Sequence, residues 1–170
     1  MDRLADLVIG GMLWTAARAL LYMLLFVGLW TWLALTAHGM DDRLGAWLPS
    51  WLSGPGVAIG AVGLAICAWC IALFVVHGRG TPAPFDAPRA FVAAGPYRWV
   101  RNPMYLGFFL FLTGYAFCAG SYPALGVAFL MLAMSHFFVL AYEEPTLEQR
   151  FGDSYRAYRE TTNRWIPRPR

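Results

Sequence analysis

The chain of 170 residues contains no lysine and few charged residues of any kind. All thirteen basic residues are arginines, and charged residues make up 14% of the sequence against 59% hydrophobic residues. A typical soluble domain carries about 25% charged residues, so this composition argues against that class. Long windows almost free of charge predict an all-α, polytopic membrane protein instead.

The sequence also lacks the residues that a disulfide framework or a metal site requires. It has three cysteines, and Cys67 and Cys70 lie in the middle of an apolar run, where a small buried side chain is the ordinary explanation. The histidines show no metal-ligand spacing; they are His38, His77 and His136. We find no P-loop, no nucleophile elbow and no nucleic-acid-binding module, so we expect neither a metal nor a nucleic-acid partner.

Four apolar runs are each close to the roughly 20 residues that cross a bilayer as a helix. They are Ala19 to Ala37, Gly56 to Val76, Met104 to Ala119 and Tyr122 to Tyr142. The last two are separated by a turn too short for anything but a hairpin. We therefore predict about four transmembrane helices in a single membrane domain, 1–170, whose N-terminal spans lie in 1–77.

Two segments beside these runs are predicted to lie at the membrane surface. Arg18 interrupts the first apolar region, so Leu4 to Ala17 is predicted to be an interfacial helix, with Arg18 reaching the inner headgroups. Leu44 to Leu52, with Trp47 and Trp51, is predicted to form an aromatic belt on the outer surface. The first run is far longer than the core of a signal peptide, about 7–15 residues, which favours a retained span.

The distribution of the arginines predicts the orientation. One arginine lies between the first and second runs, four lie between the second and third, and six follow the fourth. The last ten are Arg79, Arg89, Arg98, Arg101, Arg150, Arg156, Arg159, Arg164, Arg168 and Arg170. Arginine excess marks the cytoplasmic side, so both termini and the 78–103 loop are expected there. The same arginines are expected to attract anionic membrane lipids.

Polar residues gather where the predicted hairpin of the last two spans opens. Residues 95–107 read Gly-Pro-Tyr-Arg-Trp-Val-Arg-Asn-Pro-Met-Tyr-Leu-Gly, and the fourth run ends in Glu143-Glu144. Taken singly, each group has an ordinary explanation: Asn102-Pro103 is a good helix start, with Asn capping free amides, and the two glutamates can be the solvated end of a span. Together they predict a site at one membrane face.

The tail adds aromatic side chains at helical spacing. These residues are Leu147, Phe151, Tyr155 and Tyr158, and they predict one helix that lies on the membrane or packs on the loop.

These groups suit a ligand that is zwitterionic and partly aromatic. A helix N-terminus and Arg101 favour an anionic group. Glu143 or Glu144 suits a ribose diol or an ammonium group, and an aromatic face suits a sulfonium. S-adenosylmethionine carries all of these groups.

From Gly95 to Pro167 the chain resembles the integral-membrane methyltransferases typified by isoprenylcysteine carboxyl methyltransferase, which have phospholipid N-methyltransferases as relatives. The resemblance rests on four patterns: Gly95-Pro-Tyr-Arg-x-x-Arg-Asn-Pro-x-Tyr-x-Gly107, Glu143-Glu-x-x-Leu147, Phe151-Gly-x-x-Tyr-x-x-Tyr158 and Arg164-Trp-Ile-Pro167. It implies that 78–170 forms a half that binds S-adenosylmethionine at the cytoplasmic face and methylates a lipophilic or amphipathic acceptor that enters from the membrane.

The resemblance also implies roles for individual residues. The catalytic set is Arg101, Glu143, Glu144 and Arg164. The cofactor-binding set is Tyr97, Arg98, Arg101, Asn102, Pro103, Tyr105, Gly107, Glu143, Glu144, Tyr155, Tyr158 and Trp165. Asn102 stands where the family usually has histidine, and asparagine cannot titrate near neutrality.

Other functions remain open at this point. Membrane sterol and steroid reductases resemble the same C-terminal region and bind NADPH there, although they usually have a longer transmembrane N-terminal part. The leading prediction is methyl transfer to a carboxylate of the isoprenylcysteine type. The alternatives are N-methylation of a phospholipid of the phosphatidylethanolamine type, NADPH-dependent reduction, and a non-enzymatic membrane scaffold whose loop binds anionic lipid. The oligomeric state is not predicted.

Overall fold

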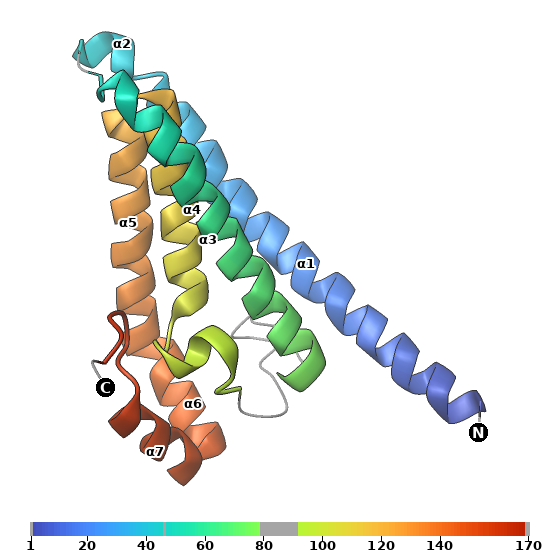
Figure 1. Cartoon of the computed structure of the whole chain (residues 1–170). Helices are drawn as coiled ribbons and strands as arrows, with labels where there is room; N and C mark the ends of the chain where they lie inside the picture. The colour runs from blue at the N-terminus through green and yellow to red at the C-terminus, as the bar shows by residue number, and fades with distance from the viewer. Residues whose placement is uncertain (1, 46, 79–91, 169–170) are drawn as a thin grey trace.

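The computed structural model describes residues 2–45, 47–78 and 92–168, and within these ranges it contains helices and no β-strand (Figure 1). The long α-helices are α1 (Asp2–His38), α3 (Ser53–Leu73), α4 (Pro103–Ala119) and α5 (Tyr122–Phe138). The short elements are α2 (Asp41–Leu44), η1 (Ser50–Leu52), η2 (Phe74–Gly78), η4 (Gly95–Arg98), η5 (Val139–Glu143), α6 (Glu144–Phe151) and α7 (Asp153–Thr161). The predicted all-α class is confirmed. Arg79, Arg89 and Arg170, used above to predict orientation, lie outside the described residues.

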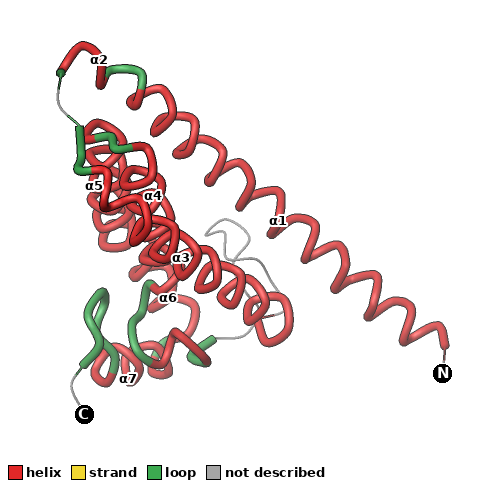
Figure 2. The backbone as a smooth tube through the Cα atoms, turned by 45° about the horizontal axis from the view of Figure 1, so that its top comes forward, coloured by secondary structure: helices red, strands yellow, loops and turns green. Residues whose placement is uncertain are grey.

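Helices α3, α4 and α5 run side by side, and α1 meets them at one end and leans away toward the N-terminus (Figures 1 and 2). Element α2 lies at the end where α1 joins the bundle. Elements η4, α6 and α7 lie at the opposite end, where both chain termini are also found. The polar segment before α4 and the polar tail are therefore collected at the same end of the molecule.

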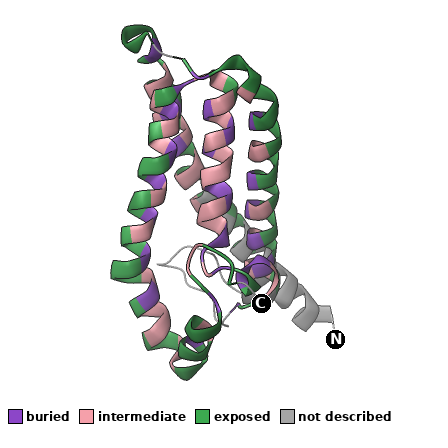
Figure 3. Ribbon diagram, turned by 60° about the vertical axis from the view of Figure 1, so that its left-hand side comes forward, coloured by how far each residue is buried: buried purple, intermediate pink, exposed green. Residues whose placement is uncertain are grey.

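The outer faces of the long helices are apolar and exposed. Leu24, Leu25 and Phe137 have exposed fractions of 68%, 64% and 69%. Buried positions form narrow stripes along the helices (Figure 3). A surface of this kind fits hydrocarbon rather than water, which places the chain in the membrane.

Three helices of the described chain are long and apolar enough to cross a membrane: Leu20–Leu44, Ser50–Val76 and Tyr122–Phe151. Pro103–Ala119 is apolar but shorter, as the sequence predicted for the third span. Its 17 residues extend about 26 Å, somewhat less than the hydrocarbon core.

Helix α1 is continuous through Arg18, so the predicted interfacial segment and the first span form one helix, and the interfacial position of Leu4 to Ala17 stays a prediction. It runs unbroken from Asp2 to His38. Arginine is a good helix former, and the Arg18 guanidinium lies 5.9 Å from the centre of the Trp14 ring one turn earlier. The charge of Arg18 bears on how deep this segment is predicted to lie in the membrane. It gives the backbone no reason to leave the helical conformation.

Helices α3 and α4 touch through their backbones at glycines. A Cβ atom added at Gly63 would lie 2.6 Å from the Phe111 nitrogen, and one added at Gly114 would lie 2.6 Å from the Gly56 carbonyl oxygen. No side chain fits at such distances, so glycine permits the close crossing, as in other membrane helix pairs. This contact holds α3 and α4 together. The segment 79–102 joins these two helices in the chain and is called the connector below.

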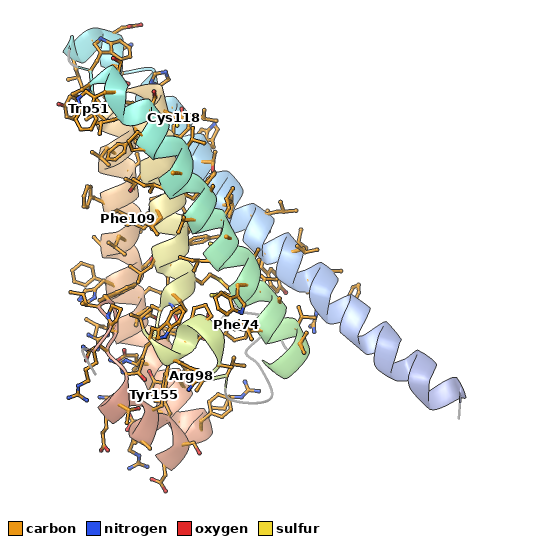
Figure 4. All side chains as sticks on the ribbon, in the orientation of Figure 1. Trp51, Phe74, Arg98, Phe109, Cys118 and Tyr155 are labelled. Carbon is orange, nitrogen blue, oxygen red and sulfur yellow. The ribbon has the colours of Figure 1, made fainter. Side chains whose placement is uncertain are left out.

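The end that holds α2 is tied together by the backbone and by one buried acid. The Leu48 amide donates to the Gly120 carbonyl at 2.7 Å, and buried Asp41 pairs with His38 at 2.9 Å. Trp51 and Cys118 lie at this end (Figure 4), and Trp51 is 71% exposed. The aromatic belt at the membrane surface stays a prediction.

The tail forms two helices where the sequence predicted one. Gly152, at φ 50° and ψ −124°, separates α6 from α7. This region of backbone space is accessible almost only to glycine. The helical spacing of the tail residues continues past Gly152, which is why the pattern did not predict the break.

Candidate functional site

The candidate site lies where the last long helix ends and meets the connector and the tail. Helix α5 continues through the π-helical turn η5 directly into α6, so Glu143 and Glu144 lie at the junction. Turns of π-helix are rare and often mark functional positions. Both the connector, around Arg101, and the tail, around Arg164, pack against this junction.

Glu144 is the centre of an ion-paired cluster. Its two carboxylate oxygens accept hydrogen bonds from Arg164 Nε and Nη2 at 2.7 and 2.9 Å, and Arg101 Nη2 lies 3.2 Å from Oε1. The Glu144 side chain is only 9% exposed. The hydrogen bond to Glu144 raises the pKa of Arg164, so this guanidinium stays charged. One buried carboxylate thus joins the connector to the tail.

Arg101 has donor groups to spare at this position. Its Nε and Nη1 atoms are buried and have no hydrogen-bond partner within the described residues. A buried donor left unpaired costs about 1–3 kcal/mol, more when it is charged. The Arg101 guanidinium can therefore still donate to an anionic or strongly accepting group.

Glu143 has a different partner from its neighbour. The Tyr105 hydroxyl donates to Glu143 Oε2 at 3.1 Å. The Tyr105 ring makes edge contacts with Phe26 of α1 at 6.3 Å and with Trp165 of the tail at 6.5 Å between ring centres. Glu143 is thus held on the α4 side of the junction by an uncharged donor.

Three consecutive tail residues, Asn163 to Trp165, bind the connector and α5. The Arg101 amide donates to the Asn163 carbonyl at 2.8 Å, and the Asn102 side-chain amide donates to the Arg164 carbonyl at 3.3 Å. The Trp165 indole donates to His136 Nδ1 at 2.9 Å. The tail therefore lies across the connector and α5 and covers the junction.

Two of these contacts differ from what the sequence indicated. Asn102 precedes α4 as predicted, but its side chain makes no capping hydrogen bond and is directed to the tail. His136 did not figure among the predicted site residues. It lies seven residues before Glu143, which is two turns of helix, and that spacing is the signal that would have pointed to it.

Of the predicted tyrosines, Tyr97 and Tyr155 are buried and Tyr158 is half-buried, and Tyr97 and Tyr158 hold the connector against α7. The Tyr158 hydroxyl donates to the Tyr97 carbonyl at 2.6 Å, and the Tyr97 ring packs on Phe74. Burial raises the pKa of Tyr155 to about 12 and raises the pKa of Tyr97 and Tyr158 as well. These hydroxyls remain protonated near neutral pH and act as neutral groups.

The remaining predicted residues lie outside the ion-paired cluster of Glu144, Arg101 and Arg164. Pro103 is buried at the first turn of α4, and Gly107 packs against Gly63 of α3. Arg98 is exposed and lines a separate pocket with Tyr158, described below. Cofactor binding by these residues stays a prediction. For Gly107, the packing against α3 is a sufficient reason for a glycine.

The arrangement combines a buried cation with spare donors, two carboxylates with separate partners and a covering segment. It can bind an anionic group at Arg101 and exclude water beneath the tail. The described residues contain no group of three or more His, Cys, Asp or Glu residues that would hold a metal ion.

Comparison with known proteins gives one family and one relative. A family model described as phospholipid methyltransferase matches residues 55–154, from α3 to the first turn of α7. The chain is also 39% identical over 64 residues to an uncharacterized protein of Haemophilus influenzae. The matched residues are 37% of this chain and all of that protein. No solved structure matches the chain.

Proposed function

Because the chain belongs to the phospholipid methyltransferase family, we propose that it transfers a methyl group from S-adenosylmethionine to a lipophilic or amphipathic acceptor in the membrane. The family match covers more than half of the chain and supports membrane methyltransferase activity. The identity of the methyl donor, the class of acceptor and the roles of individual residues are our proposal.

The observation that carries the proposal is the unpaired donor pair on Arg101. Nε and Nη1 are buried beside the Glu144 carboxylate and lack a partner among the described residues. A carboxylate ligand would accept a charge-assisted hydrogen bond from either nitrogen. S-adenosylmethionine has such a carboxylate, so the residues present fit this group.

When bound, S-adenosylmethionine supplies an electrophilic sulfonium methyl group, which needs alignment and a dry environment more than covalent help. Arg101 binds and orients the ligand. Glu144 fixes Arg101 and Arg164 in position, and the segment from Asn163 to Trp165 excludes water. The aromatic rings of Tyr105 and Trp165 present faces that suit a cation.

Two acceptor chemistries make different demands on the chain. A carboxylate of the isoprenylcysteine type is already ionised and needs no base. An amine of the phosphatidylethanolamine type must lose a proton, and Glu143 is the better candidate to take it. Glu144 already accepts hydrogen bonds from Arg164 and forms an ion pair with Arg101. Glu143 accepts one hydrogen bond, from Tyr105.

Ligand-induced stabilisation tests the donor. Purified protein is titrated with S-adenosylmethionine, S-adenosylhomocysteine and NADPH, and the melting temperature is recorded. We expect the first two to stabilise the wild type and to lose affinity for Arg101→Gln, while the exposed-arginine control Arg150→Gln behaves as wild type. Stabilisation by NADPH alone would assign the chain to the reductase alternative, and no stabilisation by any of the three would favour a scaffold.

A labelling assay tests the acceptor. Protein in vesicles is supplied with donor labelled in the methyl group and with either a prenylated cysteine or phosphatidylethanolamine. Label in a base-labile ester indicates the carboxylate acceptor, and label in the phospholipid headgroup indicates the amine acceptor. Only the amine reaction is expected to fall steeply in Glu143→Gln, because only that reaction needs a base.

A further inference from the structure

A second polar pocket lies beside the candidate site, between the connector and the end of the tail. Its volume is about 420 Å³. Its side chains come from the connector, from α7 and from the segment after α7; the most relevant are Arg98, Trp99, Tyr158, Thr161 and Arg168. Glu144, Arg101 and Arg164, which form the ion-paired cluster, do not line it.

The described lining of the pocket is positively charged. Arg98 and Arg168 line it, and no aspartate or glutamate of the described residues does. Within the described part of the chain, neither arginine forms an ion pair. Arg168 donates from Nη1 to the Glu160 carbonyl, which directs its side chain without neutralising its charge.

The neighbouring arginines show that this is a local property. Arg101 and Arg164 pair with Glu144, and Arg159 pairs with Glu148 at 2.6 Å. Arg156 lies near Glu148 and Asp153. Arginines of the tail are therefore generally matched to carboxylates on the protein, whereas the pair in this pocket leaves its charge for a ligand.

Two tryptophans place the pocket at the level of the lipid headgroups. Trp99 lines it and packs edge-on against Trp69 of α3, with 6.2 Å between ring centres. The two residues are 54% and 47% exposed. Trp69 lies in the last turns of a membrane-spanning helix, and half-exposed indoles at the end of a span are typical of the interface. Arg98 is found at this same end of the molecule (Figure 4).

We propose that this pocket binds the phosphate group of an anionic membrane phospholipid, with Arg98 and Arg168 as its charged ligands. A guanidinium group binds phosphate oxygens through two parallel N–H donors, so the two arginines of the pocket suit this group. The apolar part of the lipid would lie along the exposed face of Trp69. This site is separate from the proposed methyl-transfer site and does not depend on the transfer reaction.

The test measures lipid binding without any methyl donor. The full-length protein is purified in detergent, stripped of lipid and titrated with phosphatidylglycerol or phosphatidylcholine, and bound lipid is counted by native mass spectrometry. The pocket variant is R98Q/R168Q. The matched control is R150Q/R156Q, which removes the same charge from the tail at residues that do not line the pocket.

We expect the wild type to retain phosphatidylglycerol in preference to phosphatidylcholine. Affinity for phosphatidylglycerol should fall about tenfold or more in R98Q/R168Q, since each basic residue near an anionic surface makes a substantial contribution. It should fall less than about twofold in the control, because Arg150 and Arg156 do not line the pocket and cannot share one phosphate there. Unchanged melting temperatures of both variants show that the comparison concerns binding.

Three results would overturn the proposal. Equal losses in the two double variants would mean that the tail attracts anionic lipid through its overall charge. Equal retention of the two lipids by the wild type would mean that the pocket does not select an anionic lipid. Displacement of phosphatidylglycerol by glycerol 3-phosphate at the same concentration would assign the pocket to a soluble phosphate.

Discussion

At the scale of residues, Glu143 and Glu144 follow each other in the chain and have different surroundings. Glu144 is enclosed by Arg101 and Arg164, whereas Glu143 accepts a hydrogen bond from Tyr105. One carboxylate therefore holds charged segments together, and the other is held by a neutral group. The two should respond differently to substitution.

Glu144→Ala is expected to reduce the free energy of unfolding strongly. It leaves two guanidinium groups without their shared anion in a poorly exposed position, a change that costs about 3–5 kcal/mol when a buried pair is broken. The control is Glu148→Ala, whose carboxylate pairs with Arg159 in a more exposed position and should contribute about 1 kcal/mol or less. Thermal and denaturant unfolding in detergent measures both. If Glu144→Ala and Glu148→Ala lowered the free energy of unfolding equally, the ion pairs of Glu144 would contribute no more to stability than an exposed pair.

Tyr105→Phe is expected to lower methyl transfer to an amine acceptor, the reaction that needs Glu143 as a base, more than it lowers stability. It removes the hydroxyl that donates to Glu143 and keeps the ring between Phe26 and Trp165, so the free energy of unfolding should fall by only about 1 kcal/mol. Tyr142→Phe is the control, because Tyr142 is 45% exposed. Initial rates and melting temperatures are compared for the two variants. Unchanged rates in Tyr105→Phe would remove Glu143 positioning from the mechanism.

Some site residues were predictable at this scale and others were not. Arg101, Glu144 and Arg164 could be predicted because charged groups in an apolar chain need partners, and few partners exist. The direction of the Asn102 side chain could not, because a capping hydrogen bond and a bond to the tail suit the same residue type. The His136 contact depends on where Trp165 comes to lie, and helical spacing says nothing about that.

At the scale of elements, the glycine crossing of α3 and α4 determines how close the two helices lie. Gly63→Ala places a Cβ atom 2.6 Å from the Phe111 nitrogen, which is backbone that cannot give way locally. Overpacking of this kind costs about 1–3 kcal/mol.

Gly126→Ala is the matched control for this prediction, since nothing lies within 4 Å of a Cβ atom added at that helical position. Alanine is favoured over glycine in a helix by up to about 1 kcal/mol, so this variant should be neutral or slightly more stable. Melting temperatures in detergent measure both variants. If Gly63→Ala were equally harmless, the close contact between α3 and α4 would not be required.

The spans were predictable and the tail was not, for a physical reason. Helix α4 begins at Pro103 and ends at Ala119, and α5 begins at Tyr122, each within a residue of the predicted limits. The length of an apolar run is a local property that hydrocarbon thickness selects. The break at Gly152 and the path of the tail across α5 depend on tertiary contacts, which periodicity does not record.

At the scale of the whole molecule, the two ends of the bundle are predicted to face different compartments. Cys118 is exposed and lies at the end opposite to the tail, while Cys67 and Cys70 are buried (Figure 4). Asp153 is 99% exposed at the start of α7. The arginine distribution predicts that the tail end is cytoplasmic.

A membrane-impermeant maleimide should therefore label Cys118 from the outer side of sealed cells. The variant Asp153→Cys, made with Cys118→Ser, should be labelled only after the membrane is opened. Cys118→Ser alone controls for labelling of the buried cysteines. Labelling of Asp153→Cys in sealed cells would reverse the orientation and place the candidate site outside.

The ion-paired cluster at the end of an apolar bundle lies between two solvents, and this position determines how its kinetics must be expressed. In the proposed reaction a soluble methyl donor would reach the cluster from water, so its effective concentration would be molar. A lipid acceptor would reach it by lateral diffusion, so its effective concentration would be a mole fraction of the bilayer. Diluting the acceptor with inert lipid at constant total volume should then slow the reaction, whereas diluting the vesicles with buffer that contains the same donor concentration should leave the turnover per enzyme unchanged.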